Sequence, residues 1–166
     1  LKEPPKFHVY LPDEYHDMAD HVRYPVIITL DGWALSRTVN GVVTHLSNTA
    51  AMPKAIVVAI DNHEDYEWGP ELYVSNSGWN EPADSRLKGF SGGKADSYLS
   101  FFEKELLPFI DAEYRTDDFR IIIGMSPSAT FALHTFWKSP DLFDAHFLFA
   151  ATDVIGMGYT PETTII

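Results

Sequence analysis

The sequence contains no cysteine among its 166 residues. This absence excludes disulfide bonds, a thiol nucleophile and a zinc site built from thiolates. It says little about the compartment, and the sequence leaves open whether the protein is cytoplasmic or periplasmic.

Basic residues are also few, since 12 Lys and Arg stand against 24 Asp and Glu, for a formal net charge of −12. An acidic chain repels phosphate backbones and anionic lipids, so we expect neither nucleic acid nor a membrane surface as a partner. No apolar run approaches the roughly 20 residues that span a membrane, and we expect no membrane insertion. The oligomeric state is not indicated.

Apolar residues are plentiful: 45% of the sequence is hydrophobic and 14% is aromatic. This is enough to bury the core of one domain, or of part of a larger one. Apolar runs rich in β-branched residues predict strands. They lie at residues 24–32, 54–62, 119–124 and 144–152. An alternating stretch at residues 6–12 predicts a half-buried strand before them.

Segments with apolar residues at helical spacing alternate with these strands. They predict helices at residues 36–50, with Ser36 as N-cap, at 94–114, with a kink or break at Pro108, and at 127–139. The alternation predicts an α/β fold with a mostly parallel sheet. Residues 62–92 form a polar loop, and a loop of that length inside a compact domain is usually functional.

The stretch "IIIGMSPSATF" joins a predicted strand to a predicted helix. A serine in such a sharp turn is typical of a nucleophile elbow, G-x-S-x-G, which reads G-M-S-P-S here. The elbow needs small residues two positions before and after the serine; Gly124 meets this demand and Ser128 nearly does. Ser126 is equally well explained as a helix N-cap, because Pro127 suits the first helical position.

Three further stretches resemble a known family. "YPVIITLDGW", "AIVVAIDN" and "ELLPFIDAEYRTD" occur in this order before the serine turn. Together they are similar to the putative esterase family of α/β-hydrolases, which includes esterase D, S-formylglutathione hydrolase and the enterochelin-esterase-like branch. The resemblance covers nearly the whole chain. It implies a single domain over residues 1–166, a three-layer sandwich around a mostly parallel sheet, incomplete at the C-terminus.

The resemblance also implies roles for individual residues. Ser126 occupies the position of the catalytic nucleophile. The turn after the strand at 24–32 supplies one donor of the oxyanion hole, for which the Trp33 backbone N–H is expected, with Gly32 permitting the tight turn. A plain strand-ending turn is the other interpretation of Asp31-Gly32. The implied chemistry requires neither a metal nor an organic cofactor.

Two features depart from the family pattern. The second oxyanion donor is normally the N–H of the residue after the nucleophile, and Pro127 has none. The catalytic histidine normally follows the serine, but His134 lies two turns along the next helix and His146 opens the next strand at its amino end. We therefore expect the histidine and its acid partner beyond Ile166.

Residues of the long polar loop complete the site hypotheses. Trp68, Tyr73 and Trp79 are expected to line the substrate pocket, unless they only pack the loop. The group Asp61, His63, Glu64 and Asp65 is more simply a solvated acidic loop than a metal site. The sequence thus favours a serine-dependent carboxylic ester hydrolase acting on siderophore-type or other small esters. The alternative is a non-catalytic binding protein of the same fold with a degenerate elbow.

Overall fold

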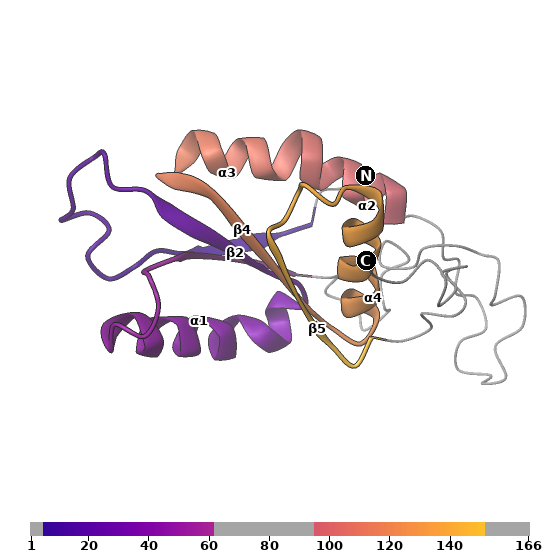
Figure 1. Ribbon diagram of the computed structural model, residues 1–166, viewed down its shortest axis with the longest axis horizontal. Coiled ribbons are helices and arrows are strands. Elements are labelled where there is room, and N and C mark those ends of the chain that lie inside the picture. Colours follow the sequence, from indigo (N-terminus) through magenta and orange to yellow (C-terminus); the bar gives the residue numbers. More distant parts are fainter. Residues whose placement is uncertain (1–4, 62–94, 152–166) are drawn as a thin grey trace, which may run out of the picture.

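The central sheet has the strand order β1-β3-β2-β4-β5 in the computed structural model, which describes residues 5–61 and 95–151 (Figure 1). The strands are β1 (Phe7–Tyr10), β2 (Tyr24–Thr29), β3 (Ile56–Ile60), β4 (Thr116–Met125) and β5 (Ala145–Phe149). β1 pairs antiparallel with β3, and the other neighbours are parallel. The predicted α/β fold with a mostly parallel sheet is therefore confirmed.

Helices cover both faces of this sheet (Figure 1). They are α1 (Gly32–Asn48), α2 (Ala95–Phe101), the π-helical turn η3 (Phe102–Leu106), α3 (Leu107–Glu113) and α4 (Pro127–Lys138). α1 lies on one face, while η3, α3 and α4 share a hydrophobic core with the other face. The result is the three-layer sandwich that the sequence predicts.

Successive residues of the inner strands point into different cores, because side chains alternate across a strand. In β2, Val26 and Ile28 face the larger core, whereas Ile27 lies between them and packs with Val43 of α1. β3 alternates in the same way. This two-sided burial explains why these strands are continuous apolar runs in the sequence.

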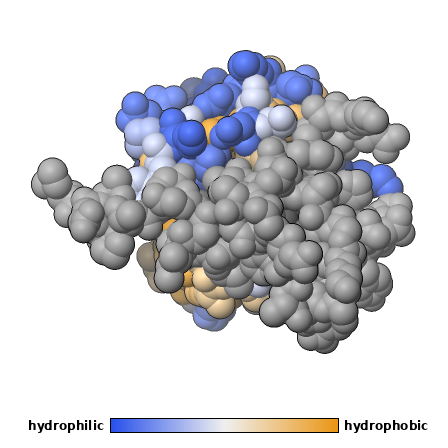
Figure 2. All heavy atoms as spheres, turned by 90° about the vertical axis from the view of Figure 1, so that its right-hand side faces the viewer, coloured by the Kyte–Doolittle hydropathy of each residue, from blue (hydrophilic) through white to orange (hydrophobic). Residues whose placement is uncertain are grey.

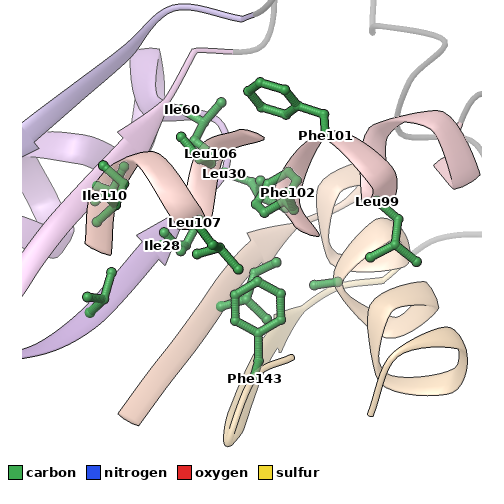
Figure 3. Packing of buried hydrophobic residues seen from close by; sticks show 14 of the residues in the cluster. Ile28, Leu30, Ile60, Leu99, Phe101, Phe102, Leu106, Leu107, Ile110 and Phe143 are labelled. Carbon is green, nitrogen blue, oxygen red and sulfur yellow. The ribbon is translucent and has the colours of Figure 1, made fainter. Parts of the chain in front are cut away.

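Phe102 lies at the centre of the larger core, fully buried between the helices and β2 (Figure 3). Its ring centroid is 5.0 Å from that of Tyr98 and 5.5 Å from that of Phe131, so it joins α2 to α4. Phe143, just before β5, packs on the same ring at 6.2 Å. Aromatic contacts thus hold the helix layer together across the sequence.

The predicted kink near Pro108 takes the form of a change in helix type. The N–H of Leu107 donates to the carbonyl of Phe102, an i to i−5 bond that widens the turn before the proline. Pro108 then lies in the first turn of α3, where its missing N–H disturbs least. The predicted helix at 94–114 therefore persists through the proline.

One predicted detail is wrong. α1 begins at Gly32, directly after Asp31, so Ser36 lies inside the helix, buried, and is not its N-cap.

β4 and β5 are only partly buried, because α1 packs on β2 and β3 rather than on them. Phe147 and Phe149 of β5 are about half exposed. Hydrophobic surface is also visible along the lower edge of the face in Figure 2.

The motif "ELLPFIDAEYRTD" has a structural explanation. Asp111 accepts hydrogen bonds from the Thr116 hydroxyl at 2.9 Å and from the Arg120 guanidinium at 2.5 Å, so α3 is tied to β4. Arg115 donates to the carbonyls of Met18 and Ala19 and of Tyr15, and its guanidinium lies 4.1 Å from the Tyr15 ring centre. It therefore holds the loop between β1 and β2.

We predict that Arg115→Ala lowers the free energy of unfolding by about 2–3 kcal/mol, because it removes several hydrogen bonds from a largely buried cation. Arg115→Lys retains the charge but not the planar fork, and its loss should be intermediate. Arg37→Ala is the control, since Arg37 is exposed on α1. Urea unfolding gives the free energy of unfolding of the three variants. Equal values for all three would contradict the role of Arg115 in holding the loop between β1 and β2.

Candidate active site

Ser126 lies at a sharp turn between β4 and α4, at the carboxyl end of the sheet. Its backbone has φ 58° and ψ −122°, a conformation that a non-glycine residue rarely adopts. Such backbone strain costs about 1–3 kcal/mol and concentrates at functional sites. A nucleophile elbow holds its serine in a strained turn of this kind so that the hydroxyl is presented outward.

Ser126 lies at the N-cap position of α4, but its hydroxyl does not cap the helix. A capping serine has an extended backbone, and its hydroxyl accepts a bond from an N–H of the first helical turn. Ser126 has a positive φ and makes no side-chain cap bond. Its backbone is anchored instead, with its N–H donating to Phe149 at 2.8 Å and its carbonyl accepting from the Thr130 N–H at 3.2 Å. Within residues 5–61 and 95–151, no hydrogen bond involves its hydroxyl.

Gly124 is required by the close approach of strand and helix. A Cβ at this position would lie 2.5 Å from the carbonyl oxygen of Ser128 and 2.7 Å from the nitrogen of Ala129. These are backbone atoms, which cannot move aside without opening the turn. The elbow pattern therefore has a direct steric cause here: the first glycine lets α4 pack against the end of β4.

The turn after β2 lies beside this elbow, because β2 and β4 are adjacent strands. The Leu30 N–H donates to the Ile123 carbonyl at 2.9 Å, which continues the pairing to the ends of both strands. Trp33 is the second residue of α1, and the first N–H groups of a helix have no partner within it. Its backbone is therefore suited to donate to an oxyanion, while its side chain is 67% exposed.

Gly32 permits the tight turn because it has no side chain, and not through a left-handed backbone. The left-handed residue of this turn is Asp31, with φ 55°. Gly32 is needed for space: a Cβ there would lie 2.7 Å from Oδ1 of Asp61 and 3.0 Å from the Ile60 carbonyl. The turn after β2 is thus packed directly against the end of β3.

A feature that the sequence did not predict joins the two turns. The Ser128 hydroxyl donates to the Asp31 carboxylate, although 97 residues separate them. It also lies 2.8 Å from the Met125 nitrogen, whose N–H it accepts. Both side chains are buried. The Ser128 hydroxyl is therefore engaged with Asp31 and Met125.

Three of the described histidines, His134, His146 and His8, do not lie beside Ser126. His134 follows it by eight residues, or about 12 Å along α4. His146 pairs with Ile122, four residues before Ser126 and about 13 Å away along the strand. His8 bonds to Asp61 at 3.0 Å, but β1 lies three strand spacings, about 14 Å, from β4. A general base must come within hydrogen-bond reach of the hydroxyl.

His134 and His146 have structural partners instead. Burial lowers the pKa of His134, against the opposing effect of Asp96, whose carboxylate lies 2.9 Å from Nε2. Burial likewise lowers the pKa of His146, which lies 3.1 Å from the Thr135 hydroxyl. Both rings are therefore neutral at pH 7 and belong to the packing around α4.

Several predicted residues lie outside the described ranges. They are Trp68, Tyr73 and Trp79, expected in the pocket wall, and His63, Glu64 and Asp65 of the acidic loop. Within the described ranges, no group of three or more His, Asp or Glu residues is arranged to hold a metal ion. None of the helices there is long and apolar enough to cross a membrane.

Comparison with known families gives one match, to the family described as "Putative esterase", over residues 1–154. No curated protein sequence matches the chain.

Solved structures share the fold. The BES protein from Bacillus cereus has 24% identity and a TM-score of 0.74, covering 88% of this chain and 57% of that one. The IroE-like serine hydrolase from Shewanella oneidensis has 24% identity and a TM-score of 0.73, with 95% and 48% covered. The siderophore hydrolase EstA from Aspergillus nidulans has 20% identity and a TM-score of 0.72, covering 88% of this chain and 52% of that one. This chain thus spans about half the length of these proteins, and its fold is of the α/β-hydrolase type.

We predict that Gly124→Ala destabilises the protein by about 1–3 kcal/mol, because the added methyl group overpacks the elbow against backbone atoms. Gly41→Ala is the matched control. Gly41 lies within α1, and a Cβ added there would meet nothing within 4 Å, so alanine should stabilise the helix by up to about 1 kcal/mol. Urea unfolding measures the stability of both variants. An unchanged free energy of unfolding in Gly124→Ala would contradict the close approach of β4 and α4.

Proposed function

The chain belongs to the putative esterase family, and we propose that the full-length protein is a serine-dependent carboxylic ester hydrolase with Ser126 as its nucleophile. The backbone conformation of Ser126 is the observation that carries this proposal. A glycine would adopt this positive-φ conformation without strain, yet the chain has a serine there, between a strand and a helix N-terminus. Its geometry is explained if the hydroxyl must be presented to a substrate.

In the proposed reaction, the Ser126 hydroxyl oxygen attacks the carbonyl carbon of an ester. Its proton passes to a general base that lies outside the described residues. The tetrahedral intermediate expels the alcohol, which takes the proton from that base, and leaves an acyl group on Ser126. Water then attacks this acyl-enzyme, gives a proton to the base, and the base returns it to Ser126 as the acid is released. The chemistry needs no metal or organic cofactor.

The oxyanion of that intermediate would be held by backbone donors. We assign these to the N–H of Trp33 in the first turn of α1 and the N–H of Ser128 in the first turn of α4. The positive ends of both helix dipoles add to the stabilisation of a negative charge there. Losing one donor typically costs about 10²–10³ in rate, so a replacement for the missing Pro127 N–H matters for activity.

The substrate class is proposed from likeness and from charge. One similar structure is a siderophore hydrolase, and the chain is acidic overall, with a net charge of −12. An acidic protein attracts anionic substrates poorly. We therefore propose siderophore-type or other small esters, with neutral ones preferred over polyanionic ones.

The second candidate is a binding protein of the same fold without catalytic activity. Pro127 favours it, because a proline after the serine removes an N–H that this fold normally uses. In that case Ser126 would keep its strained backbone as part of a binding surface, and its hydroxyl would not be activated.

We predict that the full-length protein hydrolyses p-nitrophenyl acetate and that Ser126→Ala lowers kcat by at least about 10³-fold, because the nucleophile is removed. Fluorophosphonate labelling should be lost in the same variant. Ser47→Ala is the control, since this serine lies in the last turn of α1.

Two results separate the candidates. Labelling and hydrolysis that depend on Ser126 and not on Ser47 support the esterase. Equal hydrolysis by the wild type and Ser126→Ala would exclude Ser126 as the nucleophile. A folded wild-type protein without either activity would support the binding protein.

A further inference from the structure

Asp31 and Ser128 form a buried link between the two turns that carry the proposed oxyanion donors. The Ser128 hydroxyl donates to the Asp31 carboxylate, and Ser128 is completely buried while Asp31 is 5% exposed. Asp31 is the residue before α1, and Ser128 lies in the first turn of α4. The link therefore ties together the N-termini of two helices that lie on opposite faces of the sheet.

The hydrogen bonds at Ser128 Oγ are mutually satisfied. The oxygen accepts the N–H of Met125 at 2.8 Å, and its single proton is directed to Asp31, with the Met125 carbonyl 2.9 Å away as the alternative acceptor. The link thus reaches from the turn after β2 to the last residue of β4. A carboxylate buried at such a point is costly unless it is hydrogen-bonded, so the bond specifies one arrangement of the turns.

We propose that Asp31 and Ser128 are positioning residues, which hold the N–H groups of Trp33 and Ser128 at the spacing that an ester oxyanion requires. This inference rests on the proposed esterase function. Neither side chain touches the substrate; each acts through the backbone of its own turn. Ser128 would do so most directly, since its hydroxyl immobilises the residue whose N–H is the proposed donor.

Pro127 is the reason such a link is needed. The elbow pattern has glycine at the position of Ser128, and a glycine there offers no side chain to fix the turn. Here the proline moves the second donor one residue further into the helix. Catalytic donors must be held to about 0.5 Å, and a misplacement of about 1 Å can cost about 10²-fold in rate. The Ser128 hydroxyl holds the turn in place at the point to which Pro127 has moved the second donor.

Substitutions at Asp31 can separate its left-handed backbone conformation from its side-chain bond to Ser128. Its φ of 55° lies in the left-handed region, which glycine adopts freely and asparagine tolerates better than most residues. Asp31→Gly therefore retains the backbone conformation and loses the bond to Ser128. Asp31→Asn retains both, because its side-chain oxygen accepts the same hydroxyl. Ser128→Ala removes the bond from the other side.

We expect Asp31→Gly and Ser128→Ala each to lower kcat for p-nitrophenyl acetate by about 10–100-fold, with KM changed by less than about threefold. The ground-state ester makes weaker use of the donors than the oxyanion does, so the loss falls on kcat. Asp31→Asn should recover most of the Asp31→Gly loss. The double variant Asp31→Gly/Ser128→Ala should be no slower than either single variant, because both remove the same bond.

The melting temperature and the fluorophosphonate labelling of the wild type and of each variant are measured together with the kinetics. If the wild type is active and both single variants keep kcat within about threefold, the positioning role is wrong while the esterase proposal stands. The positioning role is also wrong if Asp31→Asn lowers kcat as much as Asp31→Gly does, since loss of the bond to Ser128 would then not explain the lower kcat. If the wild type neither hydrolyses the ester nor reacts with the probe, the esterase proposal itself fails and the inference falls with it.

Discussion

The architecture of the candidate site depends on one close approach, that of the Gly124 backbone to the first turn of α4. A Cβ at Gly124 would lie 2.5 Å from the Ser128 carbonyl oxygen, so only glycine permits the strand and the helix to meet there. This contact forces the chain to reverse within two residues. Ser126 accommodates the reversal through its positive φ, and its hydroxyl makes no capping bond.

The sheet order brings the second half of the site to this turn. Because β2 and β4 are neighbours, the turn at Asp31 meets the elbow although it lies far away in the sequence. Both turns end strands and begin helices, and the contact between Asp31 and Ser128 places the two helix N-termini next to each other. The buried bond between Asp31 and Ser128 joins the two halves, and the aromatic contacts of Phe102 support α4 from the opposite side of the helix layer.

Patterns with a local cause were predictable from the sequence. β2 and β3 are apolar throughout because they are buried on both faces, and the elbow sequence reflects a steric demand among residues 124–128. Details that depend on distant neighbours were predicted wrongly or missed. Ser36 resembles an N-cap, but the helix starts at Gly32, directly after the left-handed residue Asp31. Phe147 and Phe149 are exposed because α1 does not cover β5, and the position of α1 cannot be predicted from the sequence of β5.

By itself, the sequence determined the α/β class, the family and the position of Ser126 on a strand-to-helix turn, because periodicity and short motifs are local properties of a chain. Only the tertiary structure showed that Ser126, at the N-cap position of α4, has a positive φ and makes no side-chain capping bond, since a backbone dihedral angle is not written in residue types. It alone revealed that Asp31, rather than Gly32, takes the left-handed conformation and that its carboxylate meets Ser128. That contact joins residues 97 positions apart, and only the pairing of β2 with β4 brings them together.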